Sequence, residues 1–149
     1  MEHLIRAIRE EELPRLVEMC RDHAAYEQAE YSEINKVAQL KTAIFSEKPK
    51  VFCYVVESNA ELAGYFSFTF DFSTWDAQTF LYLDTLYLEP AYRGFRIGEK
   101  IMGKLIEIAQ EHNCVNIQWQ TPEFNEGAIK FYKRIGGVAK NKVRFSYPL

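Results

Sequence analysis

The chain has 149 residues and contains only three cysteines, which are far apart in the sequence. Because Cys20, Cys53 and Cys114 never form a CxxC pair, we interpret them as buried, reduced thiols and not as a disulfide framework. The sequence also has no apolar stretch near the ~20 residues that a membrane-spanning helix needs. No basic segment followed by an apolar run stands near the first residue, so we expect no secretory signal and a cytoplasmic location.

The chain also lacks a large excess of positive or of negative charge. The 18 lysines and arginines and the 21 aspartates and glutamates give a formal net charge of −3 at pH 7. No overall field therefore favours nucleic acid or an anionic membrane, and we expect neither as a partner. The three histidines, His3, His23 and His112, lack the spacing of metal ligands, so we expect no metal site.

Hydrophobic residues, by contrast, are plentiful. They make up 48% of the chain, and aromatic residues alone make up 15%. This content is enough for a buried core and excludes a disordered chain. A length of 149 residues fits one compact unit, so we expect residues 1–149 to form a single domain.

Hydrophobic periodicity predicts the order of the secondary structure. Runs rich in β-branched and aromatic residues predict strands over residues 3–8, 51–57, 61–71, 79–88, 114–120 and 138–147. Apolar residues at helical spacing predict helices over residues 10–20, 37–44, 97–109 and 125–135. The resulting order, β α α β β β α β α β, indicates an α/β (α+β) fold. We expect a mixed, mostly antiparallel, twisted sheet with helices on both faces.

The most informative stretch, residues 86–98, runs from a strand into a helix. A strand that turns through glycines into a helix N-terminus directs several backbone N–H groups outward, and the helix dipole adds positive charge. Gly94 and Gly98 allow unusual dihedrals, and Arg93 and Arg96 add cations. These residues predict a phosphate-binding loop, but they do not indicate which phosphate compound binds there. A tight turn with arginines that face solvent is the alternative.

Residues 92–98 (YRGFRIG) resemble motif A of the GNAT superfamily of N-acetyltransferases, whose backbone N–H groups hold the pyrophosphate of coenzyme A. Arg93 and Gly98 match that motif, whereas Arg96 stands where the motif has its first glycine. Residues 125–136 (NEGAIKFYKRIG) resemble motif B, with its asparagine, Phe-Tyr pair and closing glycine. A dinucleotide fingerprint fits worse, because the GxGxxG spacing is absent. The resemblance implies a GNAT-like fold and acetyl-CoA as cofactor.

The resemblance also implies roles for single residues. Tyr132 stands where many members of the superfamily place the general acid beside the cofactor sulfur; simple packing on the sheet is the alternative. The backbone of Leu86 and Leu88 is expected to pair with the pantetheine arm, and Asn125 to bond that arm or to cap a helix. The expected cofactor-binding residues are Leu86, Leu88, Arg93, Gly94, Phe95, Arg96, Ile97, Gly98, Asn125 and Tyr132.

Asp84 is a carboxylate in the middle of an apolar strand, residues 80–88. Such a group is costly unless it is paired, hydrated or useful. An alkyl ammonium, with a pKa near ~10.4, must lose a proton before its nitrogen can attack a thioester. We therefore interpret Asp84 as a catalytic base or as the holder of a water that relays the proton. The alternative is that backbone groups nearby, at a bulge or a sheet edge, form hydrogen bonds with the carboxylate and give it a purely structural role.

Within the superfamily, the sequence is most similar to the spermidine/spermine (diamine) N-acetyltransferases. The similarity lies in Tyr26 with Glu27, in residues 68–71 with Trp75, and in residues 81–84. The aspartate at the end of this last stretch replaces that group's glutamate and is one carbon shorter. A site for a long cation needs carboxylates and aromatic faces. The expected substrate-binding residues are Glu27, Tyr31, Asp71, Trp75 and Asp84.

The sequence thus predicts an acetyl-CoA-dependent N-acetyltransferase. A primary amine of a small cationic substrate, a polyamine, a diamine or an amino-acid-like molecule, is expected to attack the thioester directly. A protein or peptide N-acetyltransferase and a non-catalytic acyl-CoA-binding domain remain as alternatives. Members of the superfamily are often dimers, and the aromatic last strand, with Phe145 and Tyr147, is compatible with a homodimer.

Overall fold

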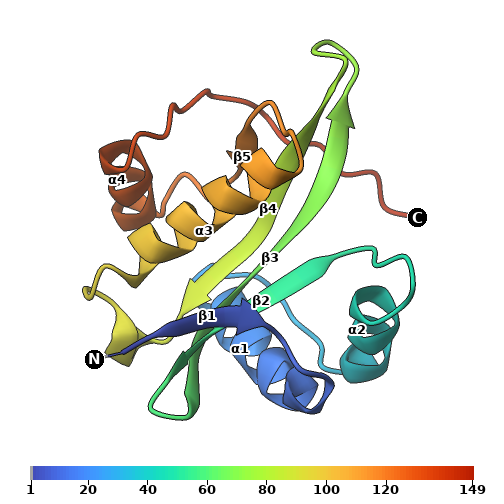
Figure 1. Cartoon of the computed structure of the whole chain (residues 1–149), viewed down its shortest axis with the longest axis vertical. Helices are drawn as coiled ribbons and strands as arrows, with labels where there is room; N and C mark the ends of the chain where they lie inside the picture. The colour runs from blue at the N-terminus through green and yellow to red at the C-terminus, as the bar shows by residue number, and fades with distance from the viewer. Residues whose placement is uncertain (1) are drawn as a thin grey trace.

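The computed structural model describes residues 2–149, and a twisted sheet forms its centre (Figure 1). Within these residues the sheet has five strands in the order β1-β2-β3-β4-β5. The pairs from β1 to β4 are antiparallel, and β4 and β5 are parallel. The mixed, mostly antiparallel sheet is thus confirmed. The strands are β1 Leu4–Ala7, β2 Phe52–Ser58, β3 Glu61–Ser73, β4 Gln78–Leu88 and β5 Ile117–Trp119.

Helices lie where the apolar periodicity predicted them, three between strands and α4 after β5. They are α1 Leu13–Tyr26, α2 Lys36–Ile44, α3 Ile97–Glu111 and α4 Glu126–Arg134. Short 3-10 turns at Glu10–Glu12 and Pro90–Tyr92 precede α1 and the loop before α3. Pro14 lies in the first turn of α1, where its missing N–H removes no helical hydrogen bond.

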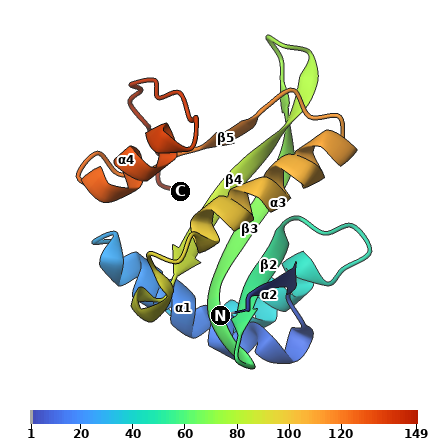
Figure 2. The same cartoon turned by 60° about the vertical axis from the view of Figure 1, so that its left-hand side comes forward.

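The two faces of the sheet carry different helices. On one face α3 packs against a cluster that includes Phe68 and Leu83. On the other face α1 and α2 pack against residues such as Val55 and Tyr65. Figure 2 shows α1 and α3 on opposite sides of the sheet. Successive strand residues point to opposite faces, so each long strand contributes to both hydrophobic clusters.

The two strands β4 and β5 diverge towards one end of the sheet. They pair only where Leu81–Leu83 meets Ile117–Trp119, although β4 continues to Leu88. Asp84 has no partner in β3, because Ser67 pairs with Thr85 and Phe68 with Leu83. This bulge bends β4 at the point where the pairing with β5 ends. The β5-facing edge of β4 is therefore unpaired from the bulge onward.

The strand predicted over residues 138–147 is wrong for this structure. The segment forms no strand, and the part of the chain described here gives it no backbone hydrogen-bond partner. Its alternating side chains Val143, Phe145 and Tyr147 are 79%, 89% and 90% exposed. Alternation marks a segment that can form a strand, but a strand also needs a neighbouring edge within reach. The segment leads from the end of α4, at the left of Figure 1, to the C-terminus at the right.

Candidate active site

The loop between β4 and α3 contains two residues with positive φ. Gly94 has a φ of +86°, and a Cβ built there meets nothing within 4 Å, so conformation and not crowding favours glycine. Arg96, directly before α3, has a φ of 60° and a ψ of 20°. A non-glycine residue in this left-handed region costs roughly 1 kcal/mol. The backbone at position 96 thus keeps the conformation that suits the glycine of motif A.

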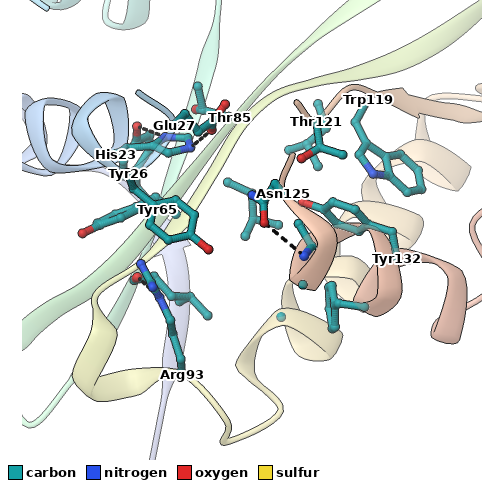
Figure 3. Close-up of a pocket in the computed structure, with 18 of the residues that line it drawn as sticks. His23, Tyr26, Glu27, Tyr65, Thr85, Arg93, Trp119, Thr121, Asn125 and Tyr132 are labelled. Carbon is teal, nitrogen blue, oxygen red and sulfur yellow. Dashed lines mark hydrogen bonds and ion pairs between the residues drawn. The ribbon is translucent and has the colours of Figure 1, made fainter. Parts of the chain in front are cut away.

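The side chain of Arg93 folds back towards α1. Its Nε donates to the backbone oxygen of Leu88 at 2.9 Å. Its guanidinium lies over the ring of Tyr26 at 4.7 Å and over the ring of Tyr87 at 5.6 Å. These contacts tie the end of α1 to β4 and to the start of the loop. Figure 3 shows Arg93 reaching towards Tyr26.

Gly98 has a packing role that the sequence did not reveal. A Cβ built on it would lie 2.7 Å from Cζ of Phe131 and 3.3 Å from two further atoms of the same ring. Glycine therefore lets α4 approach the first turn of α3 closely. Phe131 precedes Tyr132, so this close approach lies next to the predicted proton donor. The two motifs of the sequence meet at Gly98.

A cavity of about 920 Å³ opens where β4 and β5 diverge. One wall comes from the end of α1, from β3 and β4, and from the loop before α3. The other wall comes from the end of β5, the segment after it, and α4 (Figure 3). The predicted residues that line it are Glu27, Tyr31, Asp84, Leu86, Leu88, Arg93, Gly94, Arg96, Ile97, Gly98, Asn125 and Tyr132.

Three predicted site residues do not line this cavity. Phe95 is 50% exposed at the surface of the loop. Asp71 lies on the long β3–β4 hairpin, where its carboxylate accepts a hydrogen bond from the Thr69 hydroxyl at 3.0 Å. Trp75 lies near the tip of the same hairpin and is 99% exposed. The structure thus brings the cofactor motif together with Glu27 and Asp84, but not with the aromatic tip of the hairpin.

Tyr132 presents its hydroxyl to the cavity (Figure 3). Its ring stands edge-on to Trp119, with 5.3 Å between the ring centroids. Burial raises the pKa of the Tyr132 phenol, and the carboxylate of Glu27 raises it further. The phenol is therefore protonated at neutral pH, as a proton donor must be.

The side chain of Asn125 caps α4. Its Oδ1 accepts a hydrogen bond from the backbone N–H of Ala128 at 3.2 Å. This contact matches the capping alternative and leaves the amide NH2 of Asn125 available to the cavity. Leu86 and Leu88 lie on the unpaired edge of β4, where backbone groups have no strand neighbour on the β5 side.

Asp84 lies at the bulge of β4, and its side chain is exposed. It lines the main cavity and also a smaller one of about 410 Å³ on the α1 and α2 side of the sheet. The backbone of Asp84 thus lies at a bulge, as the alternative interpretation expected. Its carboxylate nevertheless faces space that a substrate could fill.

Sequence reasoning missed a histidine in the cavity wall. His23 of α1 is hydrogen-bonded to the Tyr65 hydroxyl at 3.0 Å through Nδ1, and its Nε2 contacts the Glu27 carboxylate. Burial lowers the pKa of His23, in opposition to Glu27, which raises it. The helical spacing of four residues between His23 and Glu27 was a signal that could have found this pair. Nothing in the sequence pointed to Tyr65, which comes from β3.

Two further findings concern what the structure lacks. Within residues 2–149, no group of three or more histidine, cysteine, aspartate or glutamate side chains is arranged to hold a metal ion. Over the same residues, none of the helices has both the length and the apolar character needed to cross a membrane.

The comparison with protein families agrees with this geometry. Residues 5–137, which include the loop, the cavity walls and α4, match the acetyltransferase (GNAT) family. The chain belongs to the GNAT acetyltransferase family. It is an N-acetyltransferase by this membership, and the resemblance of residues 92–98 and 125–136 is confirmed at the level of the family.

Two curated relatives are similar in sequence to most of this chain. The thialysine N-epsilon-acetyltransferase of Sus scrofa is 31% identical over 142 residues, covering 89% of this chain and 82% of that protein. The spermidine/spermine N(1)-acetyltransferase-like protein 1 of Homo sapiens is 24% identical over 132 residues. That match covers 84% of this chain but only 19% of the human protein.

Solved structures confirm the GNAT fold. The aminoglycoside N-acetyltransferase AAC(6')-Iy, in complex with CoA, superposes with a TM-score of 0.81 over 99% of this chain and 95% of that one. The two sequences are only 11% identical, so this likeness concerns the fold alone.

Proposed function

We propose that this GNAT acetyltransferase transfers an acetyl group from acetyl-CoA to a primary amine of a small cationic substrate by direct attack on the thioester. The observation that carries the proposal is the cavity between the diverging strands. This one cavity is lined by the unpaired edge of β4, by the N-terminus of α3, and by Asp84, Glu27 and Tyr132. We take residues 1–149 to act as one acetyltransferase domain.

The unpaired edge and the loop fit a molecule with an amide-rich arm and a pyrophosphate. Backbone groups of Leu86 and Leu88 can bond the arm as an added strand does, although the Leu88 oxygen already accepts one bond from Arg93. Backbone N–H groups of residues 94–98 and the positive end of α3 suit the pyrophosphate. The CoA bound to the structurally similar AAC(6')-Iy supports this choice of cofactor.

Bound acetyl-CoA supplies an activated acetyl group as a thioester. On the substrate side, Asp84 is placed to accept the proton of the ammonium, directly or through a water, so that the nitrogen lone pair becomes available. On the cofactor side, the phenol of Tyr132 is placed to give its proton to the departing sulfur when the C–S bond breaks. The backbone N–H of Leu86 is suited to bond the carbonyl oxygen as it gains negative charge.

The charge of the cavity suggests a cationic substrate. Glu27 and Asp84 line it on the α1 and β4 side, and Tyr31 adds an aromatic face. Two relatives are named for thialysine and for spermidine and spermine, which are amines of this kind. We keep Asp71 and Trp75 as predicted substrate contacts only, since the hairpin that carries them lies outside the cavity wall.

A thiol-release assay with an amine panel tests the proposal. Acetyl-CoA is mixed with the chain and with spermidine, putrescine, a lysine analogue, thialysine or a peptide, and a reaction without amine is the blank. We expect release above the blank with at least one free diamine or amino-acid-like amine. Release only with the peptide would favour a protein acetyltransferase. Binding of acetyl-CoA without release by any amine would favour an acyl-CoA-binding domain.

The partner and the compartment are also proposals. We infer a homodimer in which the exposed segment 143–147 of one chain pairs with an edge or face of the other, because its alternating apolar side chains find no cover in their own chain. The three free cysteines, Cys20, Cys53 and Cys114, favour a reducing compartment such as the cytoplasm.

A further inference from the structure

The imidazole of His23 has a contact at each ring nitrogen and on one face of the ring, in the cavity wall formed by the end of α1. Its Nδ1 lies 3.0 Å from the Tyr65 hydroxyl, and its Nε2 contacts the Glu27 carboxylate. The ring stacks on Tyr87 with 5.3 Å between centroids. The side chain is 13% exposed, compared with 31% for Glu27. The carboxylate is therefore more accessible than the histidine that contacts it, and both residues line the cavity (Figure 3).

These contacts determine the tautomer of the neutral ring. An ionised carboxylate only accepts hydrogen bonds, so Nε2 must carry the hydrogen that faces Glu27. Nδ1 then has a lone pair, which accepts the hydrogen of the Tyr65 hydroxyl. Burial raises the pKa of the Tyr65 phenol, so this hydroxyl keeps its hydrogen at neutral pH. Tyr65 thus orients His23, and His23 orients Glu27.

Charged and titratable groups surround the ring from every element that packs against it. They are Cys20 of α1, Glu27 directly after α1, Tyr65 of β3, Asp84 and Tyr87 of β4, and Arg93 of the following loop. Burial and Arg93 lower the pKa of His23, while Glu27 and Asp84 raise it, and the sum lies below the ordinary value. His23 is therefore neutral at pH 7, so the ring adds no positive charge beside the Glu27 carboxylate.

We propose that His23 and Glu27 form a subsite for the second positive charge of a dicationic substrate, with Glu27 as the contact and His23 as its positioning residue. This inference rests on the proposed acetyl transfer in the same cavity. The amine that reacts lies at Asp84 and Tyr132, and the distal ammonium lies at Glu27. The Nε2–H bond keeps the carboxylate in one orientation, so that less conformational entropy is lost when the cation binds.

The same arrangement makes the subsite sensitive to pH. Protonation of His23 adds a positive charge beside Glu27 and turns the pair from a net anion into a neutral ion pair. It also places a hydrogen on Nδ1, so that the Tyr65 hydroxyl can no longer donate to that atom. Both changes weaken the binding of a second ammonium, while a substrate with one amine has no charge at this position. By linkage, bound dication must in turn lower the pKa of His23.

Matched substrates separate this subsite from the reaction centre. Putrescine and butylamine have the same carbon chain, but only putrescine has a second ammonium. Groups that act on both substrates affect both kcat/KM values equally. Their pH dependence therefore cancels in the ratio of the two values. In the parent chain we expect this ratio to be constant above about pH 6.5 and to fall at lower pH, as His23 takes up its proton. NMR titration of the His23 ring should give the same midpoint.

Three variants test the roles within the pair. Glu27→Gln should lower the ratio at pH 7.5 by roughly three- to tenfold, because a neutral amide replaces the carboxylate. His23→Leu, which removes the donor, should also lower it. His23→Gln keeps a donor on the same turn but cannot titrate. It should therefore retain most of the ratio at pH 7.5 and abolish its fall at lower pH.

Each outcome bears on a separate claim. A ratio that stays constant with pH in the parent chain, or that still falls in His23→Gln, overturns the role of His23. An unchanged ratio in Glu27→Gln, which lies partly exposed and is expected to fold, overturns the subsite itself. Absence of thiol release with both amines contradicts the proposed function itself. Release with both amines and a ratio near one contradicts only the inference about His23 and Glu27.

Discussion

Arg96 combines an unfavourable backbone conformation with an exposed side chain in the phosphate loop. Its left-handed dihedrals are those of a glycine, with a φ of 60° and a ψ of 20°. In Arg96→Gly, relief of this conformation outweighs the greater freedom of the unfolded chain, and we expect a gain of about 0.5–1 kcal/mol in the free energy of unfolding. Denaturant titration measures this change.

The same variant shows which part of Arg96 binds the cofactor. If the backbone N–H makes the contact, the Kd for acetyl-CoA from calorimetry should stay within about threefold of the parent value. A loss beyond about tenfold would show that the guanidinium itself contacts the pyrophosphate, contrary to our expectation.

Tyr132 is placed to act on the departing sulfur and not to hold the cofactor. In Tyr132→Phe the ring keeps its contact with Trp119 and loses only the hydroxyl. We expect kcat to fall by about 100-fold or more, because general acid catalysis contributes on this scale, while the Kd for acetyl-CoA changes little. Steady-state kinetics and calorimetry measure the two quantities. Equal turnover by the variant and the parent chain would remove Tyr132 from the proposed role.

His23 also links stability to pH. Because burial lowers its pKa in the folded chain, the unfolded chain binds the proton more readily. The contribution of His23 to stability is therefore fully present above about pH 6.5 and decreases as the pH falls through that value towards the lower folded pKa. The difference in unfolding free energy between the parent chain and His23→Gln should shrink between pH 7 and pH 5. A difference independent of pH would contradict this assignment.

At the scale of elements, the approach of α4 to α3 depends on Gly98. A Cβ at this position would lie 2.7 Å from the ring of Phe131, so the ring and α4 must move. We expect Gly98→Ala to lower the free energy of unfolding by about 1–3 kcal/mol. Turnover should also fall, because Tyr132 moves with its neighbour. Chemical denaturation and the thiol-release assay measure the two effects.

Gly103 provides the matched control on the same helix. It lies in α3, and a Cβ there would meet nothing within 4 Å. Gly103→Ala should therefore raise stability by about 0.5–1 kcal/mol through helix propensity and leave turnover unchanged. If both alanine variants had the same effect, the contact between Gly98 and Phe131 would not be what limits the position of α4.

The elements differ in how far the sequence could predict them. Apolar periodicity placed α3 and β4 well, because their buried faces repeat over many residues. It gave a wrong strand over residues 138–147, since periodicity says nothing about whether an edge is within reach. For the site, the glycines and the Phe-Tyr pair identified both motifs. The contact of His23 with Tyr65 depends on how α1 lies on β3, which no local pattern encodes.

At the scale of the whole molecule, the segment after α4 forms no strand and pairs with no strand among residues 2–149. The family match ends at residue 137, and Phe145, Tyr147 and Leu149 beyond it are almost fully exposed. If two chains cover these side chains for each other, a chain that ends at Gly137 should be monomeric. Light scattering coupled to gel filtration is expected to give a dimer for the full chain and a monomer for the shortened one.

A point variant provides the control for this truncation. Phe145→Asp places a charge among the exposed apolar side chains without shortening the chain, and it should also shift the equilibrium towards the monomer. A full chain that is monomeric at all accessible concentrations would contradict the proposed homodimer. The active site of one chain, which contains all the cavity residues described above, could still function in that case.

We propose above that the cavity between β4 and β5 transfers acetyl groups from acetyl-CoA to a small amine. The most direct measurement is mass spectrometry of a reaction that contains the chain, acetyl-CoA and putrescine, with free CoA quantified in the same sample. We expect mono-acetylated putrescine and free CoA in equal amounts, both strongly reduced in Tyr132→Phe. Free CoA without any acetylated amine, or acetyl groups found only on the protein itself, would contradict it.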